Sequence, residues 1–387
     1  MNKRAFLEEL GRLTGAMPGQ ERQKLLDYYE EMIDDRVEEG IPEEEAVAAL
    51  GDPADIAREF APAGVRETAG PSAQSVGALN GLRVRAIDAD VAVVREAIPG
   101  GAAAQLRFSQ PERFTWRMDG DVLVVEEKAP GMREINLLGL KLKLSGALFE
   151  SGLKVTVALA GDLAGEFDFE SRGGDLTVNG VNVGGGATLS LASGDAELAH
   201  VGVGGDLEIG CKSGNVRLDD VRVGGSARVK SASGDVEAAN LAVAGDLALN
   251  SASGDVTLRE LRCGALDVSA MSGDVEIDRG SAGATRIQCA SGDIRLDELE
   301  SDPELQAETA SGDVELTRCI ARRSWIKTMA GDVSLRLEPL PCGYDIAADT
   351  RSGDISLPRD NPAPQAGDAR PTISVQSMSG DIEAKLL

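Results

Sequence analysis

Aspartate recurs at a fixed spacing along the C-terminal half of this chain, and carboxylates repeated in this way could bind cations. A Ser-Gly-Asp-type element occurs eleven times, with Gly173 or Ala330 in place of serine in two copies, and its glycine lies at residues 174, 194, 214, 234, 254, 273, 292, 312, 331, 353 and 380. Calcium takes about six to eight oxygen ligands from several carboxylates, whereas each copy offers a single aspartate, replaced once by Asn215. The copies also differ from the nonapeptide of calcium-binding β-rolls. We therefore interpret the element as a turn, with a calcium-stabilised repeat as the alternative.

Nucleophilic and metal-assisted catalysis need titratable side chains that converge in a pocket. His200 is the only histidine, and it lies in a predicted surface turn, so zinc sites built on several histidines are excluded. The stretch GVGGDL at 202–207 precedes a predicted strand rather than a helix, so it is not a dinucleotide-binding loop. The cysteines are odd in number and lack metal-ligand spacing, which predicts free, packed thiols and a reducing compartment: Cys211, Cys263, Cys289, Cys319 and Cys342.

Paired carboxylates, which β-helical polysaccharide lyases and hydrolases use, occur at Asp219-Asp220 and at Glu298 with Glu300. We expect these pairs at turns of different height, and aromatic residues, which form platforms for sugar rings, make up only 3% of the chain. We therefore expect no enzymatic activity. No catalytic, cofactor-binding or metal-binding residue is assigned, and no cofactor is expected.

The residues that follow each aspartate alternate in polarity. The first and third positions are apolar and the second is polar in every copy, as in Val256-Thr257-Leu258. This alternation predicts a strand with one buried and one exposed face. A second short strand follows in most copies, such as Leu207-Glu208-Ile209 after the turn at Gly204-Gly205.

Two strands and two tight turns in about 20 residues leave no room for a crossover helix. The repeats therefore predict a mainly β fold, a parallel β-solenoid (β-helix) of eleven coils, on the order of 50 Å long at the strand spacing. Glycine would supply a special backbone conformation, and serine and aspartate would bond their own backbone to close each turn. In one coil the predicted inward residues are Val256, Leu258, Leu261, Leu266 and Val268.

Residues 1–62 are predicted to form a small all-α domain ahead of the solenoid. Apolar residues recur at helical spacing in two stretches, Phe6, Leu10, Leu13 and Met17, and then Leu25, Tyr29, Ile33 and Val37. Pro42 opens a third helix, and Gly51-Asp52-Pro53 joins it to a fourth at 54–60. With 16 acids and 7 bases this segment carries a net charge of −9. It could bind another protein or simply present a solvated face.

The remaining segments are less regular. Residues 63–79 are predicted to be a flexible linker, and residues 80–387 the solenoid, with irregular opening coils or a cap over 80–170 and the Ser-Gly-Asp coils over 171–387. The leucine-rich stretch 135–149 is expected to be a buried strand pair or end cap; the alternative is an exposed loop that docks a partner or a bilayer surface. The proline-rich loop 358–371 is expected to protrude.

Composition restricts the partners. The chain has 387 residues and a formal net charge of −26, which argues against binding to nucleic acid or anionic lipid. Neither a signal-peptide core nor an apolar run long enough to span a membrane is evident. We expect a cytoplasmic protein; the alternative is a cell-surface protein reached by unconventional export.

Two parts of the sequence resemble known bacterial families. The stretches FLEELGRL, LLDYYEEMIDDRVEEG and EEEAVAALGDPADIAREF, within about residues 1–60, resemble the HAAS-type helical signalling domain. The SGDV coils, over about 80–387, resemble the "putative adhesin" β-strand-repeat family. The resemblance implies a non-enzymatic β-solenoid and a setting in envelope-stress or transcriptional regulation.

These observations predict a non-catalytic scaffold or binding protein. The helical domain would engage a protein partner, and the solenoid would offer a rigid, acidic interaction surface. A surface-exposed, adhesin-like binder is the alternative, and protease accessibility on intact cells distinguishes the two.

Overall fold

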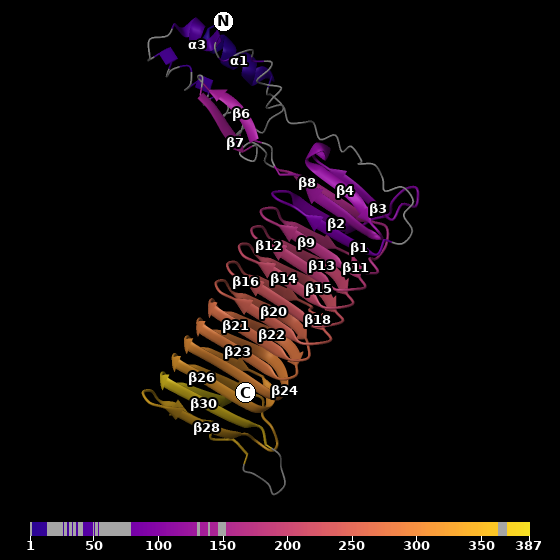
Figure 1. Ribbon diagram of the computed structural model, residues 1–387. Coiled ribbons are helices and arrows are strands. Elements are labelled where there is room, and N and C mark those ends of the chain that lie inside the picture. The colour runs from indigo at the N-terminus through magenta and orange to yellow at the C-terminus, as the bar shows by residue number, and fades with distance from the viewer. Residues whose placement is uncertain are drawn as a thin grey trace. The chain divides into compact units, whose positions relative to one another are not determined.

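The computed structural model divides into two compact units, residues 1–67 and 68–387, each described here by itself (Figure 1). The fourth helix expected at 54–60 and residues 63–78 of the expected linker lie outside the described residues. The residues that the structure describes are 2–13, 26, 29–30, 33, 36–37, 42–48, 50, 53, 79–129, 132–137, 140–145, 152–362 and 370–387.

The first unit contains helices α1 (Lys3–Leu13) and α3 (Glu43–Ala48). The side chain of Asn2 begins α1, because its Oδ1 accepts a hydrogen bond from the backbone N–H of Ala5 at 2.9 Å. Phe6, Leu10, Ile33, Ala46 and Val47 form a small buried cluster. Tyr29, Ile33 and Val37 are helical as predicted, although Val37 is exposed; Met17 and Leu25 lie outside the described residues.

The second unit is a parallel β-solenoid with coils of about 20 residues, as predicted. Each coil has three faces where the repeat predicted two. The first face follows the motif aspartate in the chain. The short second face follows the first face, and the third face comes after the second and precedes the next motif serine. First-face strands, several of which continue into the second face, are β10 (Leu176–Asn179), β13 (Ala196–Val203), β15 (Val216–Val223), β17 (Val236–Ala239), β20 (Val256–Arg262), β22 (Val275–Ala282), β24 (Ile294–Ser311), β25 (Val314–Thr317) and β27 (Val333–Leu337), and the separate second-face strands are β11 (Asn182–Val183) and β18 (Ala242–Val243).

The third-face strands pair in register with one another along the stack, for example Ile209 with Val229 and Val229 with Leu249. The C-terminal part of β24 belongs to this face as well. The other strands of the third face are β9 (Phe167–Ser171), β12 (Ala187–Leu191), β14 (Leu207–Cys211), β16 (Ala227–Ser231), β19 (Leu247–Ser251), β21 (Leu266–Ser272), β23 (Thr285–Ser291) and β26 (Ile320–Ala330).

One continuous apolar core runs through the stack. All five inward residues predicted for one coil are buried: Val256, Leu258, Leu261, Leu266 and Val268. Burial of each such side chain contributes about 1.5–3 kcal/mol before entropy costs, so stacking supplies the stability that a single coil lacks.

The first-to-second-face corner needs a left-handed residue, which is a glycine at Gly180 and a non-glycine in the following coils. His200, Asp220 and Glu260 have φ of 55°, 50° and 55°, and Arg279 and Arg318 take the same conformation. From Glu260 to Arg318, acidic and basic residues alternate along this column. The Arg318 guanidinium, for example, lies 2.9 Å from the Glu298 carboxylate.

The Ser-Gly-Asp corner joins the third face to the first, and its glycine is required for two reasons. Gly254 has a φ of +114°, and a Cβ built on it would lie 2.3 Å from the carbonyl oxygen of Gly234 in the preceding coil. Nine motif glycines, from Gly174 to Gly331, stack in sequence order, so the regular part has eight turns rather than the eleven coils predicted.

The motif aspartates do not bond their own turns, which corrects the sequence-based interpretation. Each Oδ1 accepts a hydrogen bond from the backbone N–H of the motif aspartate in the next coil. Asp274 N–H thus donates to Asp255 at 2.8 Å, and Asp255 N–H donates to Asp235 at 2.9 Å. Asn215 takes part through its amide oxygen. We call this column the aspartate ladder. It begins at Asp90 and ends at Asp354.

The motif serine is not the side chain that closes the corner either. A hydroxyl or thiol three residues before the glycine donates to its carbonyl in several coils, as from Ser251 to Gly254 at 3.3 Å and from Cys211 to Gly214 at 3.4 Å. In later coils the same inward position bonds the corner of the preceding coil, as from Thr309 to Gly292.

The N-terminal end of the solenoid is capped, and its coils are out of sequence order. β1 (Gly81–Arg85) lies between β9 and β5 (Val122–Glu127), and β2 (Asp90–Arg95) lies between β10 and β8 (Lys154–Leu159). The outermost coil, formed by β5 and β8, is covered by antiparallel β3 (Ala104–Phe108) and β4 (Phe114–Asp119), joined through the 3₁₀ turn η1 (Pro111–Arg113).

The expected buried strand pair at 135–149 is a separate antiparallel hairpin of β6 (Met132–Leu137) and β7 (Leu140–Ser145). Its two strands pair with each other in a sheet of their own. The burial of its side chains lies outside what the structure describes.

The C-terminal end also departs from sequence order. β30 (Thr372–Ser379) and β31 (Ile382–Leu386) stack directly on β26 and β27, whereas β28 (Asp345–Thr350) and β29 (Ile355–Ser356), which come earlier in the chain, form the last coil outside them (Figure 1). The eleventh motif copy therefore lies between the ninth and the tenth.

The aspartate ladder predicts a sharp difference between two substitutions. Asp255→Ala removes the acceptor for Asp274 N–H and should lower the free energy of unfolding by about 1 kcal/mol. Asp255→Asn should cost less than about 0.5 kcal/mol, because an amide oxygen accepts the same bond, as Asn215 does, and a like charge about 4.8 Å from its neighbours is removed. Urea denaturation followed by circular dichroism measures both.

The same denaturation curves test the calcium alternative. Because each Oδ1 in the ladder already accepts a backbone N–H, the curves should be unchanged by EGTA. Equal losses in the two variants, or a loss of β-structure on adding EGTA, would contradict the ladder as the reason for the aspartates.

Candidate binding groove

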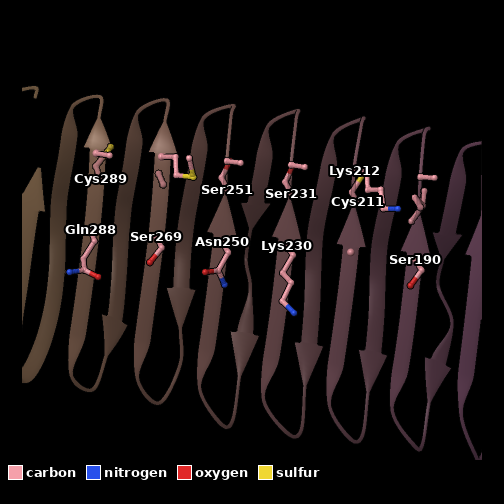
Figure 2. Close-up of a pocket in the computed structure, with 18 of the residues that line it drawn as sticks. Ser190, Cys211, Lys212, Lys230, Ser231, Asn250, Ser251, Ser269, Gln288 and Cys289 are labelled. Atoms are coloured by element: carbon pink, nitrogen blue, oxygen red, sulfur yellow. The ribbon is translucent and has the colours of Figure 1, made fainter. Parts of the chain in front are cut away.

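A long groove follows the third face beside the Ser-Gly-Asp corner, with a volume of about 1290 Å³ (Figure 2). It crosses nine successive coils, from Glu170 to Lys327. Nine coils span eight intervals of about 4.8 Å, or about 38 Å. We call it the corner groove.

Three columns of residues line the corner groove. The outward column near the end of each third-face strand is Glu170, Ser190, Gly210, Lys230, Asn250, Ser269, Gln288, Glu308 and Lys327. The inward column next to it includes Ser171, Cys211, Ser231, Ser251, Cys289 and Thr309, and the column just before the motif serine includes Arg172, Ala192, Lys212, Ala232, Ala252, Met271, Ala290, Ala310 and Met329. Figure 2 shows the first two columns running side by side across the strands.

Small residues explain why the surface is hollow here. Five of the nine residues in the third column are alanine, so little side chain fills the space beside the corner. The recurring Ala-Ser-Gly-Asp stretches already contain these alanines, but no groove was predicted from them. The hollow follows because stacking in register repeats the same small side chain at each level.

The residues that line the corner groove carry a small excess of positive charge, although the chain is acidic. Four lining residues are basic (Arg172, Lys212, Lys230, Lys327) and two are acidic (Glu170, Glu308), a local excess of two positive charges. This lining differs from the acidic interaction surface that the sequence predicted for the solenoid.

Apolar side chains gather at one end of the groove. Met329 is exposed, and the register of β26 with β30 places it beside Met378, which is also exposed. Trp325 is exposed two residues before Lys327. Flexible thioethers and an exposed indole are typical of surfaces that bind apolar side chains.

The two groove cysteines are poor nucleophiles. Burial raises the pKa of the Cys211 and Cys289 thiols, with nearby aspartates adding to the effect. The Cys289 Sγ–H also donates to the Gly273 carbonyl at 3.4 Å. Burial likewise raises the pKa of Cys263 to about 12 and of Cys319 to about 11, and all five cysteines are free.

The other residues considered for chemistry lie at the first-to-second-face corner, outside the groove. His200 Nδ1 lies 3.1 Å from Asp220 Oδ2; this hydrogen bond, and then Arg222, lower the pKa of Asp220. Glu298 pairs with Arg318. Asp219 and Glu300 do not line the groove either. Within the described residues, no group of three or more His, Cys, Asp or Glu side chains could hold a metal ion.

Family models match most of the chain. The model described as Toastrack DUF4097 matches residues 135–240 and 228–385, which together cover the whole regular solenoid. The chain belongs to the Toastrack DUF4097 family. The match does not confirm membership of the "putative adhesin" β-strand-repeat family, which the SGDV coils resemble. The HAAS model matches residues 5–59, which confirms the predicted resemblance of the helical segment ahead of the Toastrack solenoid.

The solved structures that resemble this Toastrack chain include two that are distant in sequence. No curated protein matches it. A solved structure described as a "putative adhesin" from Parabacteroides distasonis is 13% identical, with a TM-score of 0.29, over 81% of this chain and 94% of that one. A "putative cell adhesion protein" from Clostridium sporogenes is 9% identical, with a TM-score of 0.16, over 80% and 94%. TM-scores and sequence identities this low carry no argument about function. Among the described helices of the Toastrack chain, none is long and apolar enough to cross a membrane.

Proposed function

We propose that this chain is a non-catalytic binding protein whose corner groove takes an extended peptide segment of a partner protein. The observation that carries the proposal is the groove itself: about 38 Å long at the strand spacing, repeated in register over nine coils, and lined by small, polar and apolar side chains. A peptide extended at about 3.3 Å per residue would fill it with about eleven residues.

The lining favours a peptide over other ligands. Serine, asparagine and glutamine side chains at Ser190, Asn250, Ser269 and Gln288 offer hydrogen bonds to a peptide backbone. No aromatic ring lines the groove to stack on a sugar. The excess of basic side chains suits a segment that carries acidic residues, and the methionines suit an apolar anchor at one end.

The proposal excludes a catalytic role for the groove. Its thiols are buried and hydrogen-bonded to corner carbonyls, and the histidine lies on another corner. These positions support binding and orienting of a ligand as the role of the groove.

The helical unit would supply the second contact. Its match to HAAS supports a module that engages a protein partner, and we propose that the whole chain acts as a cytoplasmic scaffold in bacterial envelope-stress or transcriptional regulation. The groove and the helical unit would then bring two proteins together.

A displayed peptide library tests the groove function. Random peptides of about eleven residues, the length that fills the groove, are selected on the full chain, and their affinities are measured by fluorescence polarisation. Ala252→Trp places an indole in the groove and should weaken the selected peptides at least about tenfold, as loss of a buried contact typically does.

The matched control is Thr257→Trp, which adds the same ring to the outward side of the first face, away from the groove. Affinities should not change in this variant. Failure to enrich any peptide, or equal binding to Ala252→Trp and wild type, would rule the proposal out.

A further inference from the structure

The two ends of the solenoid differ in how they are closed. At the N-terminal end, β3 and β4 cover the outermost coil, and their Phe108 and Phe114 rings stack on each other with centroids 5.0 Å apart. At the other end, β28 and β29 form the last coil, and in the described part of the chain no strand pairs with their outer edges.

The core is open at this end. Ile355 and Leu357, at inward positions of the last coil, are 44% and 41% exposed, whereas Val333 and Leu335, at the same positions two coils further in, are each 1% exposed. An apolar core cut open in this way is typical of a surface that is covered by another molecule.

The free edge of β28 is ready to pair. The N–H groups of Asp345 and Arg351 donate inward, to Pro371 at 3.0 Å and Ser377 at 3.3 Å. In a parallel strand the alternate residues point the other way, so the backbone groups of Ile346, Ala348 and Thr350 face the open edge. β28 contains no lysine and no proline, two residue types that block exposed edges; its only charged residues are Asp345 and Asp349.

We propose that a second copy of this chain covers the open end, with β28 pairing antiparallel to β28 of the other copy about a two-fold axis at Ala348. A second copy fits because the surface to be covered is a complete coil end, with two strand edges around an apolar centre. Two-fold symmetry supplies that same arrangement from the partner.

The charges of β28 select this register. Pairing about Ala348 places Asp345 opposite Arg351 of the second copy, twice by symmetry, and sets Asp349 opposite Ala347. A shift by one residue toward Ala347 would set Asp345 opposite Asp349, and a shift toward Asp349 would set that aspartate opposite its own copy. Only the register about Ala348 pairs most of the strand without opposing two acids.

Sedimentation velocity on the full chain tests the proposal. The wild type should form a dimer in a concentration-dependent way. Arg351→Asp sets acid against acid at two places and should weaken the dimer about tenfold. Asp345→Arg should weaken it similarly, because it sets two bases together. The double exchange Asp345→Arg with Arg351→Asp restores opposite charges and should bring the affinity back to near wild type.

Two further variants separate pairing from charge. Ala348→Pro removes an edge-facing N–H that makes no bond in the described part of the chain, so it should abolish the dimer and leave circular dichroism unchanged. Arg228→Asp makes the same charge change as Arg351→Asp on the outward side of β16 and should leave the dimer intact. A chain that stays monomeric at all concentrations, or a dimer insensitive to Ala348→Pro and to the charge exchanges, would overturn the proposal. Peptide binding in the corner groove is measured separately, so either result leaves the proposed function to its own test.

Discussion

Replacing Gly254 with alanine is expected to lower the free energy of unfolding by about 3–5 kcal/mol, the sum of backbone strain and overpacking. The new Cβ would lie 2.3 Å from the carbonyl oxygen and 2.6 Å from the carbonyl carbon of Gly234, and the φ of +114° is closed to side chains. Both neighbouring corners are held by bonds of the aspartate ladder, so the clash cannot relax by moving one coil.

Urea denaturation measures this loss, and Gly210→Ala is the matched control. Gly210 lies in β14, has an ordinary strand φ, and a Cβ added there meets nothing within 4 Å. Alanine at Gly210 should change the free energy of unfolding by less than about 1 kcal/mol, in the stabilising direction. If the two variants lose the same stability, the corner geometry is not the reason for the repeated glycine.

Replacing Glu127 with alanine should also cost about 3–5 kcal/mol, because it removes a buried carboxylate that accepts from three buried or half-buried backbone N–H groups and from a guanidinium. Its side chain is fully buried at the end of β5. Oε2 accepts the backbone N–H groups of Ile87, Asp88 and Ala89 at 2.6, 3.0 and 3.1 Å, and Oε1 accepts from Arg113 Nη2 at 3.0 Å. One carboxylate thus holds the corner between β1 and β2 and joins it to the cap.

Glu126, the residue before it, provides the control. Its side chain is 32% exposed and pairs with Arg117 at 3.1 Å, so Glu126→Ala should cost less than about 1 kcal/mol. Thermal unfolding compares the two, and hydrogen exchange of residues 87–89 should accelerate only in Glu127→Ala. Slow exchange at these amides in Glu127→Ala would show that another group holds the corner.

Local sequence patterns predicted the strands of each coil but not the hydrogen bonds between coils. The alternation after each aspartate correctly predicted the inward side chains of Val256, Leu258 and Leu261, because burial on one face is a property of neighbouring residues. The ladder bond from Asp274 to Asp255 joins residues 19 apart, and it exists only once two identical corners are stacked. A single copy of the motif contains no sign of it, so the aspartate was assigned to its own turn.

The order of the coils at the ends was also beyond sequence reasoning. β28 and β30 carry similar alternation, and either would pair with β26, so the pattern cannot decide which one does. The inward position of the Glu127 side chain could not be predicted for a related reason. It follows the apolar run of β5 beside a second glutamate, and only the tertiary structure shows which of the two points inward.

The interleaved C-terminal coils have a consequence for biosynthesis. β28 and β29 leave the ribosome before β30 and β31, yet they pair only with those later strands and not with β26 or β27. Folding during translation can extend the stack one coil at a time as far as β27 and must then pause. β28 and β29 therefore remain unpaired until β30 and β31 have been synthesised and have inserted between them and the coil of β26 and β27.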